Sequence, residues 1–516
     1  MDTKALRQKI LDLAIRGKLV PQDPSDEPAS VLLEKIREEK ARMVKEGNLK
    51  KKDIKNDSII YVGEDNLHYE KFQDGTVKCI EDELPFEVPN NWAWARLRNI
   101  CMMAAGKAKP ANQIKATPFE GGFPCFGGNG IRGYVDEYNQ EGTFSIVGRQ
   151  GALCGNINIA SGKFYATEHA VVTTLFAGID FNWSNYILEA LNLNEYSTGA
   201  AQPGLSVANV LNVFVPVPPT QEQKRIGQKI SKSIKTINII EQEKQNLQTI
   251  IADTKSKVLD LAIRGQLIPQ NPDDEPASVL LDRIRAEKEE LIKQGKIKRD
   301  KKESIIFKGE DNSYYEKLGE DVCCIDEEIP YDIPDSWEWV RLKNCCIKEI
   351  RRGKSPKYAV KSNTLVFAQK CNTKYNGIDI GLALYLDEST LGRYPNEEYM
   401  HGGDVVVNST GTGTLGRIGF YRTTDNIPGF PIVPDSHVTV IRGFRSIRAF
   451  YLYIFMKANQ SVLEKKGEGS TNQKELKPIT LKEMLVPMPP ASEQQRIENA
   501  IITAFSFIET IEKSLN

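Results

Sequence analysis

The chain has 516 residues, with 68 Lys and Arg against 69 Asp and Glu, so its formal net charge is -1. This length predicts three or four folding units rather than one large core. The composition, 40% hydrophobic and 27% charged, excludes a disordered chain, and the charge balance excludes a polyanion-binding protein that is basic throughout.

The N-terminus mixes charged and apolar residues at helical spacing, which excludes a signal peptide, and no stretch is apolar enough to cross a membrane. The nine cysteines are odd in number and contain no C-x-x-C pair, so neither a disulfide framework nor a zinc ribbon is indicated. We therefore expect a cytoplasmic protein with reduced thiols and no contact with a membrane.

The chain repeats itself. Residues 11–40, LDLAIRGKLVPQDPSDEPASVLLEKIREEK, return at 259–288 as LDLAIRGQLIPQNPDDEPASVLLDRIRAEK, with 23 of 30 positions identical. The likeness ends in PFEVPNNWAWARL at 85–97, which returns as PYDIPDSWEWVRL at 330–342. Identity over this length excludes chance and predicts a duplicated unit.

A second repeated block is VPVPPTQEQKRI at 215–226, which returns as VPMPPASEQQRI at 486–497. The central part of the chain joins both repeat types, whereas one type opens the chain and the other closes it. Placed together, the two chain ends would rebuild a second copy of the central element. We therefore predict a ring-like, pseudo-twofold protein whose termini lie near each other.

The repeated blocks predict helices. Residues 221–264 contain no proline and carry apolar residues close to the 3.5-to-3.6 period, which predicts one helix roughly 66 Å long. Gly265 ends it, as Gly17 ends the N-terminal copy. A second helix is predicted over about 277–294, with 29–45 as its counterpart. Such helices either pack as a bundle or act as a rigid spacer, and the pseudo-symmetry allows both.

Two variable regions lie between the blocks, at 92–215 and 337–485, and show no obvious identity with each other. Both are rich in short Val, Ile, Phe and Tyr runs broken by Gly, Asn and Thr, which predicts mostly β domains with one or two helices each, for example at 183–193 and 447–465. The predicted fold class is α+β, with two mostly β domains separated by long antiparallel, coiled-coil-like helices.

The sequence contains few motifs that would indicate an enzyme. The four histidines have no metal-ligand spacing, and G-x-S-x-G and the Walker A sequence are missing. His169 is more often an ordinary half-buried histidine in such a context. Gly411 to Gly416 match G-x-G-x-x-G, but the residues that follow have strand-like composition, which favours a tight turn over a cofactor loop. The run in the first variable region that corresponds to 411–416 is 145–151, which has a strand-and-turn composition but no G-x-G-x-x-G pattern.

Local charge favours binding over catalysis. Residues 92–211 carry 8 basic and 8 acidic side chains, whereas 337–482 carry 22 against 13, a net charge of +9. A basic excess in a polar β domain suits phosphate contact, although a solvated surface has the same composition. Arg, Asn and Gln also gather beside glycines, and these side chains read guanine and adenine in the major groove. The alternative is that Asn and Gly simply form turns.

The order of blocks, the segments LDLAIRGKLVPQ…EPASVLL and VPVPP-EQ-RI, and the runs PCFGGNGIRGYVDEY, IVGRQGALCGNI and DVVVNSTGTGTLGRIGFY resemble the DNA-specificity subunit of type I restriction-modification systems. The resemblance covers essentially the whole chain. It implies two target recognition domains, each reading one half of a split DNA site, and helices that set the gap and dock two methyltransferase subunits.

The resemblance also fixes the predicted organisation and partners. The predicted domains are an N-terminal helical segment (1–60), a connecting segment (61–91), recognition domain 1 (92–215), a central helical spacer (216–300), a second connecting segment (301–336), recognition domain 2 (337–485) and a C-terminal helix that pairs with the N-terminal segment (486–516). The partners implied are double-stranded DNA, two methyltransferase subunits and, in the full complex, nuclease and translocase subunits. S-adenosylmethionine, ATP and Mg belong to those partners, so no cofactor, metal or catalytic residue is expected in this chain.

By residue type and position at the glycine turns, we predict DNA contacts from two sets of residues. They are Asn129, Arg132, Arg149, Gln150, Lys163 and Gln202 in the first domain, and Gln369, Lys370, Asn372, Lys374, Asn408, Thr412, Thr414, Arg417 and Lys474 in the second.

Two other functions stay open at this stage. One is a standalone sequence-specific DNA-binding regulator of similar architecture, which would be stable without methyltransferase partners. The other is a fused methyltransferase, which would need an N-P-P-[YF]-like motif and a cofactor loop before a helix, and the sequence has neither.

Overall fold

The computed structural model describes residues 2–151, 153–198, 203–299, 303–375, 377–411, 413–468 and 474–515. The chain forms two compact units, Met1–Lys244 and Gln245–Asn516. Each unit contains one copy of the repeated sequence, called the scaffold below, and one variable region.

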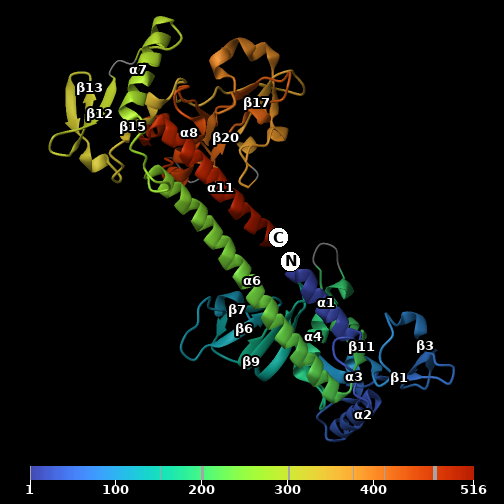
Figure 1. The fold of residues 1–516 in the computed structure, drawn as a ribbon. Helices are drawn as coiled ribbons and strands as arrows, with labels where there is room; N and C mark the ends of the chain where they lie inside the picture. Colours follow the sequence, from blue (N-terminus) through green and yellow to red (C-terminus); the bar gives the residue numbers. More distant parts are fainter. Residues whose placement is uncertain are drawn as a thin grey trace. The chain divides into compact units, whose positions relative to one another are not determined.

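The scaffold of the first unit is built from helices and a small antiparallel sheet (Figure 1). Its helices are α1 (Thr3–Ile15) and α2 (Ala29–Lys45), and its three strands are β1 (Ser58–Val62), β2 (His68–Phe72) and β3 (Val77–Cys79). A two-stranded ladder of β4 (Ala93–Arg96) and β11 (Phe214–Val217) closes the variable region, because it joins the residues that enter the region to those that leave it.

A six-stranded sheet forms most of the first variable region, in the order β5-β10-β8-β9-β6-β7. Its strands are β5 (Cys101–Ala105), β6 (Phe123–Gly127), β7 (Gly130–Val135), β8 (Gln140–Gly148), β9 (Ile157–Ala166) and β10 (Ala170–Leu175). The helices of this region are α3 (Leu97–Ile100), α4 (Phe181–Ala190) and α5 (Val207–Val210). Trp183 of α4 is fully buried in the core that the sheet shares with α1 and α2.

Helix α6 (Thr220–Ile263) is one continuous helix of 44 residues, as the sequence predicted. In the first unit α1 lies along it, and Arg7 of α1 forms an ion pair of 2.9 Å with Glu241. In the second unit α11 (Ala491–Leu515) lies along the later part of α6, and Lys255 forms an ion pair of 2.7 Å with Glu512. The long helix therefore has a helical partner within each unit.

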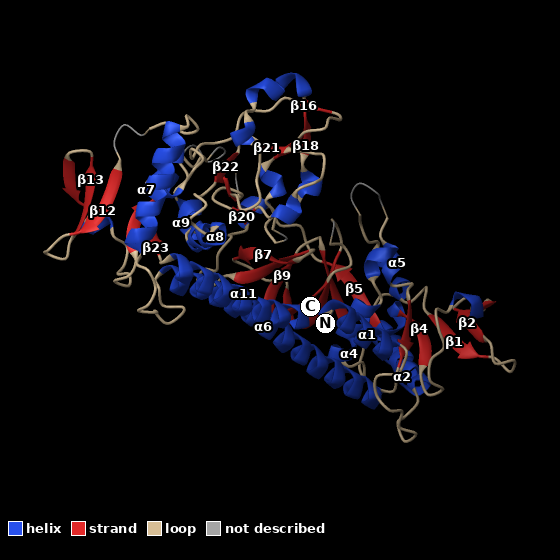
Figure 2. Ribbon diagram, turned by 45° about the horizontal axis from the view of Figure 1, so that its top comes forward, coloured by secondary structure: helices blue, strands red, loops and turns tan. Residues whose placement is uncertain are grey.

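The second unit repeats the scaffold and carries a different variable region. Its scaffold contains α7 (Ala277–Lys293), the sheet of β12 (Ser304–Lys308), β13 (Tyr314–Leu318) and β14 (Asp321–Cys324), and the closing ladder of β15 (Glu338–Arg341) with β23 (Leu485–Met488). Helix α7 stands between this three-stranded sheet and the strands of the variable region (Figure 2).

Two sheets form the second variable region, in the orders β16-β18-β17-β21 and β20-β19-β22. The strands are β16 (Tyr358–Ala359), β17 (Leu365–Phe367), β18 (Leu384–Leu386), β19 (Val405–Asn408), β20 (Ile418–Phe420), β21 (Ile432–Pro434) and β22 (Val438–Ile441). Its helices are α8 (Ala449–Ala458), α9 (Gln460–Lys465) and α10 (Pro478–Lys482). The helix predicted over 447–465 is thus two helices, because the chain leaves helical geometry at Asn459.

The two scaffold copies reproduce the same buried contacts. The indole N–H of Trp92 donates to the carboxylate of Glu222 at 2.9 Å, and that of Trp337 donates to Glu493 at 2.9 Å. Both carboxylates also accept a hydrogen bond of 2.6 Å from a glutamine side chain. Identical residues at repeated positions therefore form the same buried hydrogen bonds in the two units.

Two glycines end equivalent helices with left-handed backbone. Gly17 has φ +66° and Gly265 has φ +68°, and residues other than glycine rarely adopt such backbone angles. This confirms the predicted helix ends. That the two chain ends lie near each other stays a prediction, as do the domain boundaries. Among the described residues, no helix is long and apolar enough to cross a membrane.

Candidate nucleic-acid interface

The first cluster of predicted residues lies where β8 ends. The peptide N–H of Arg149 donates to the carbonyl of His169 at 2.9 Å, and the carbonyl of Arg149 accepts from Leu205 at 2.8 Å. Gln150 forms an isolated bridge with Gly204. These backbone bonds fix the turn on both sides, while the side chain of Arg149 is half-buried and that of Gln150 is exposed.

The β6–β7 turn lies against the same place. A Cβ atom on Gly148 would lie 2.1 Å from the carbonyl oxygen of Gly128, so only glycine allows the two turns to approach this closely. Asn156 donates to the side chain of the exposed Asn129 at 3.0 Å. The structure therefore brings Asn129, Arg149 and Gln150 together from separate segments.

The other predicted residues of this region lie elsewhere or outside the described chain. Arg132 is exposed on β7, and Lys163 is exposed on β9, where its ammonium lies 4.6 Å from the ring centre of Tyr138. Gln202 lies outside the described residues.

The second cluster lies where β19 ends, and two of its predicted residues are buried. Asn408 and Asn372 have relative exposures of 0% and 1%. The Asn372 amide donates to Asn408 at 3.2 Å and to the carbonyl of Arg417 at 3.0 Å, and the Asn408 amide donates to the carbonyl of Gln369 at 3.1 Å. These two amides hold the turn together from within, so we assign them to its support and not to its contact surface.

Gln369, Thr414 and Arg417 lie around that buried pair. The hydroxyl of Thr414 donates to the side-chain oxygen of Gln369 at 3.4 Å. The guanidinium of Arg417 donates to the carbonyl of Asn372 at 2.9 Å and to that of Gly413 at 3.2 Å. All three side chains are partly exposed, so this group faces outward while its hydrogen bonds fix its shape.

Three predicted lysines are exposed in this unit: Lys370, Lys374 and Lys474. Lys374 stands beside Tyr375, whose ring is 84% exposed and lies 5.0 Å from the Lys374 ammonium. Thr412 lies outside the described residues. The glycine-rich run around it leads from β19 to β20 and not into a helix, which confirms the prediction of a turn in a β domain.

Sequence reasoning missed several polar residues of these clusters. The first cluster contains Glu168 and His169, with 3.3 Å between the Glu168 carboxylate and His169 Nε2. The second contains Thr410 and His437, and the Thr410 hydroxyl and His437 Nδ1 form a hydrogen bond of 2.6 Å. Asp435 supports the second cluster from inside, and burial raises the pKa of its carboxyl. The available signal was the similar runs ATEHAVV and PDSHVTV, each entering the strand that pairs with the turn strand.

The clusters suit contact with a polyanion bearing hydrogen-bonding edges more than they suit catalysis. They offer guanidinium, amide, hydroxyl and imidazole groups on well-fixed turns. Among the described residues, no group of three or more His, Cys, Asp or Glu side chains could hold a metal ion.

Comparison with known proteins decides the family. The model of the type I restriction modification DNA specificity domain matches residues 89–249 and 334–516, which is more than half of the chain and includes both clusters. The chain belongs to this family. It is thus a type I specificity subunit, a non-catalytic member of its system, and the resemblance drawn from the sequence is confirmed.

Relatives of this specificity subunit are known in Escherichia coli. It is 28% identical to the type I restriction enzyme EcoAI specificity subunit over 66% of its own length and 62% of that protein. It is 25% identical to the EcoEI specificity subunit over 99% of its own length and 90% of that protein.

One solved structure matches the fold of the specificity subunit with a TM-score of 0.51 at 14% identity. It covers 84% of this chain and 94% of that one, and comes from a study of complex assembly and conformational transition of the type I restriction-modification system. At this identity the match shows the fold alone: two β-rich regions joined and separated by long helices.

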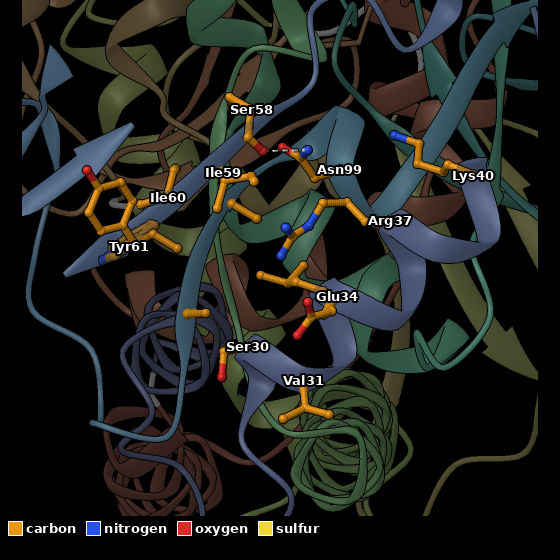
Figure 3. A pocket seen from close by; sticks show the side chains of 14 residues that line it. Ser30, Val31, Glu34, Arg37, Lys40, Ser58, Ile59, Ile60, Tyr61 and Asn99 are labelled. Carbon is orange, nitrogen blue, oxygen red and sulfur yellow. Dashed lines mark hydrogen bonds between the residues drawn. The ribbon is translucent and has the colours of Figure 1, made fainter. Parts of the chain in front are cut away.

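The specificity subunit has a further hollow surface at the scaffold of its first unit. A cavity of about 230 Å³ lies between α2 and β1, lined by Val31, Glu34, Arg37, Ile60 and Trp94 among others. Arg37 extends from the helix across this groove toward β1 (Figure 3). The amide of Asn99 caps the outer edge of β1 by donating to the carbonyl of Ser58 at 3.1 Å.

The second scaffold has a smaller groove at the equivalent place, and part of its lining is the same. Its lining includes Arg285, Ile306 and Trp339, the counterparts of Arg37, Ile60 and Trp94. The side-chain amide of Asn344 donates a hydrogen bond of 2.9 Å to the carbonyl of Ser304 on β12. Its cavity is only about 30 Å³. Val340 lines this groove where Ala95 lines the first one.

Proposed function

We propose that this specificity subunit reads a bipartite, asymmetric DNA site, with each variable region binding one half. The observation that carries the proposal is the pair of polar turns at the ends of β8 and β19. They are fixed by backbone bonds of the same kind but carry different side chains, Arg149 and Gln150 in one and Thr410 and Arg417 in the other. Different side chains on equally rigid turns suit the reading of two different base sequences.

Helix α6 sets the gap between the half-sites in this proposal. Its 44 residues extend about 66 Å at 1.5 Å per residue. Contacts with α1 in the first unit and with α11 in the second support its two parts, which favours a rigid spacer over a flexible linker. A rigid spacer excludes half-sites at other separations.

The scaffolds each dock one methyltransferase subunit, which modifies adenine at N6, and the ATP-dependent nuclease joins through those subunits. The repeated grooves support this part, because equivalent residues, such as Arg37 and Arg285, line both grooves in a chain whose variable regions have no obvious identity. S-adenosylmethionine, ATP and Mg act in the partner subunits. The basic second variable region supplies phosphate contacts, and the methyltransferases supply more, since the whole chain is almost neutral.

Genome-wide mapping of N6-methyladenine in cells with and without this chain tests the proposal. We expect a bipartite methylated motif that disappears when the chain is deleted. Unchanged methylation would overturn the proposal. Purification of the chain with the methyltransferase separates it from a standalone regulator, which would bind DNA without capturing that subunit.

A further inference from the structure

The turns after β8 and β19 are two copies of one device, although their sequences differ. The carbonyl of Gly148 accepts from Gly155 at 2.8 Å, and that of Asn408 accepts from Gly416 at 2.8 Å. The described residues of the first turn contain two left-handed glycines, with φ of +91° and +84°, and those of the second contain three, with φ of +101°, +76° and +75°. The closing hydrogen bond and the left-handed glycines at positions 151 and 411 and at 155 and 416 indicate a common frame.

A third segment completes the frame in both regions. Leu205 donates its N–H to the carbonyl of Arg149, and Leu476 donates to that of Ser409, both at 2.8 Å. Gln150 bridges Gly204 in the first frame, and Thr410 bridges Glu475 in the second. Residues 149 and 150 are therefore equivalent to residues 409 and 410.

One polar residue is common to the two frames. The N–H of Arg149 donates to the carbonyl of His169 at 2.9 Å, and the N–H of Ser409 donates to that of His437 at 2.8 Å. The chain has only four histidines, and two of them occupy this one position. The backbone carbonyl makes the supporting bond, which any residue could supply, so the frame itself does not require an imidazole.

We propose that His169 and His437 each contact a phosphate of the DNA backbone, one in each half-site. This inference rests on the proposed function. Two domains that read different bases share only the sugar–phosphate backbone as a ligand, so a side chain common to both frames fits the backbone, whereas the differing residues beside it fit the bases.

The two histidine side chains differ in their exposure and in the groups next to their ring nitrogens. His437 is exposed, and its Nδ1 is engaged with the Thr410 hydroxyl at 2.6 Å, which orients the ring and leaves Nε2 outside that bond. His169 has 38% side-chain exposure, and its Nε2 lies 3.3 Å from the carboxylate of Glu168. That carboxylate must move aside or be repelled when a phosphate approaches.

The test uses the complex of this chain with its methyltransferase subunits and a set of duplexes, one with the mapped site and others with single mismatches. We expect His169→Ala and His437→Ala each to weaken binding about fivefold to tenfold on every duplex, with the ratio between matched and mismatched duplexes unchanged. The controls are His68→Ala in the first unit and His401→Ala in the second, which should leave binding unchanged. Thermal unfolding of each complex checks that the fold is kept.

Duplexes with a single neutral methylphosphonate locate the contact. At one position in each half-site we expect the wild-type complex to lose affinity and the corresponding histidine variant to lose no more. Relief of the repulsion in Glu168→Gln should tighten binding to all duplexes.

A changed base preference, unchanged affinity, or equal sensitivity of wild type and variant at every phosphate would overturn the inference. If the wild-type complex shows no preference between the matched and mismatched duplexes, the proposed function fails and this inference with it.

Discussion

At the scale of single residues, buried carboxylates of opposite behaviour stabilise each scaffold. Burial works against ionisation of Glu70, but hydrogen bonds from Arg96 and Ser58 outweigh it, so the pKa of Glu70 lies below its usual value. Burial raises the pKa of Glu222, and the hydrogen bonds from Trp92 and Gln22 compensate only in part. Glu316 and Glu493 repeat the two cases in the second unit.

These shifts predict opposite effects of pH. The depressed pKa of Glu70 means that its contribution to stability is present at neutral pH and is lost as pH falls below about 4.5. The free-energy gap between wild type and Glu70→Gln should therefore be about 2 kcal/mol at pH 7 and should shrink toward pH 4. For Glu222→Gln the gap should widen over the same range, because protonation of Glu222 favours the folded state. Urea unfolding at several pH values measures both, and gaps that move in the same direction would contradict the assignment.

Under the proposed function, we expect Arg149 to read a base in the first half-site. Its backbone is held on both sides, and its half-buried side chain is equivalent in position to Ser409. We expect Arg149→Ala to relax one position of one half-site, at a cost of about 1–3 kcal/mol in discrimination, and to leave the other half-site unchanged. Methylome mapping of the variant measures this, with Arg225→Ala, which removes a scaffold ion pair to Asp26, as a control for general destabilisation.

At the scale of elements, the polar turns after β8 and β19 depend on their glycines. Gly155 and Gly416 have left-handed φ, and a Cβ atom on them would lie 2.4 Å and 2.7 Å from the backbone nitrogens of Asn194 and Glu464. Backbone nitrogens cannot move aside as a flexible side chain can.

We therefore expect Gly155→Ala and Gly416→Ala each to destabilise their own variable region by about 2 kcal/mol or more. Limited proteolysis and urea unfolding measure the loss. Gly162→Ala provides a matched control, since that glycine has φ +79° but no atom within 4 Å of the added Cβ, so strain alone acts there. An equal loss at Gly162 would show that close packing contributes nothing.

At the scale of the whole molecule, α6 runs from the first unit into the second, and its length can be changed by insertion. Seven residues inserted after Lys244 would add about 10.5 Å of helix and keep nearly the same face toward its helical partners. Because successive base pairs of DNA are about 3.4 Å apart, we expect both half-sites to persist and the gap to widen by about three base pairs. Methylome mapping measures the gap, and an unchanged gap would contradict the role of α6 as spacer.

The repeated grooves predict how the partners bind. Charge reversal of Arg37 and Arg285 together should reduce capture of the methyltransferase subunit at least tenfold, and each single change should remove about one of two captured copies. The matched control is reversal of Lys35, which lies on the exposed face of α2 in an ion pair with Glu27. Co-purification with the subunit ratio measured by mass checks this, and normal capture by the double variant would exclude the grooves.

The sequence by itself determined much of this architecture, so several elements could be predicted from it. The repeats, the proline-free period of α6 and the helix-ending glycines are local or self-similar patterns, so they predict elements without any knowledge of packing. The family could also be identified, because the order of blocks extends over the whole chain.

The exposure of the predicted contact residues was decided only by the tertiary structure. Asn372 and Asn408 have the residue types of base-reading side chains, yet packing buries them, and no local pattern reveals burial of an amide in a turn. Residues 149, 169 and 205 come together through backbone bonds between distant segments, as do 409, 437 and 476. Backbone bonds carry no side-chain signature, so two variable regions with no obvious sequence identity share one frame, and those bonds place their histidines at equivalent positions.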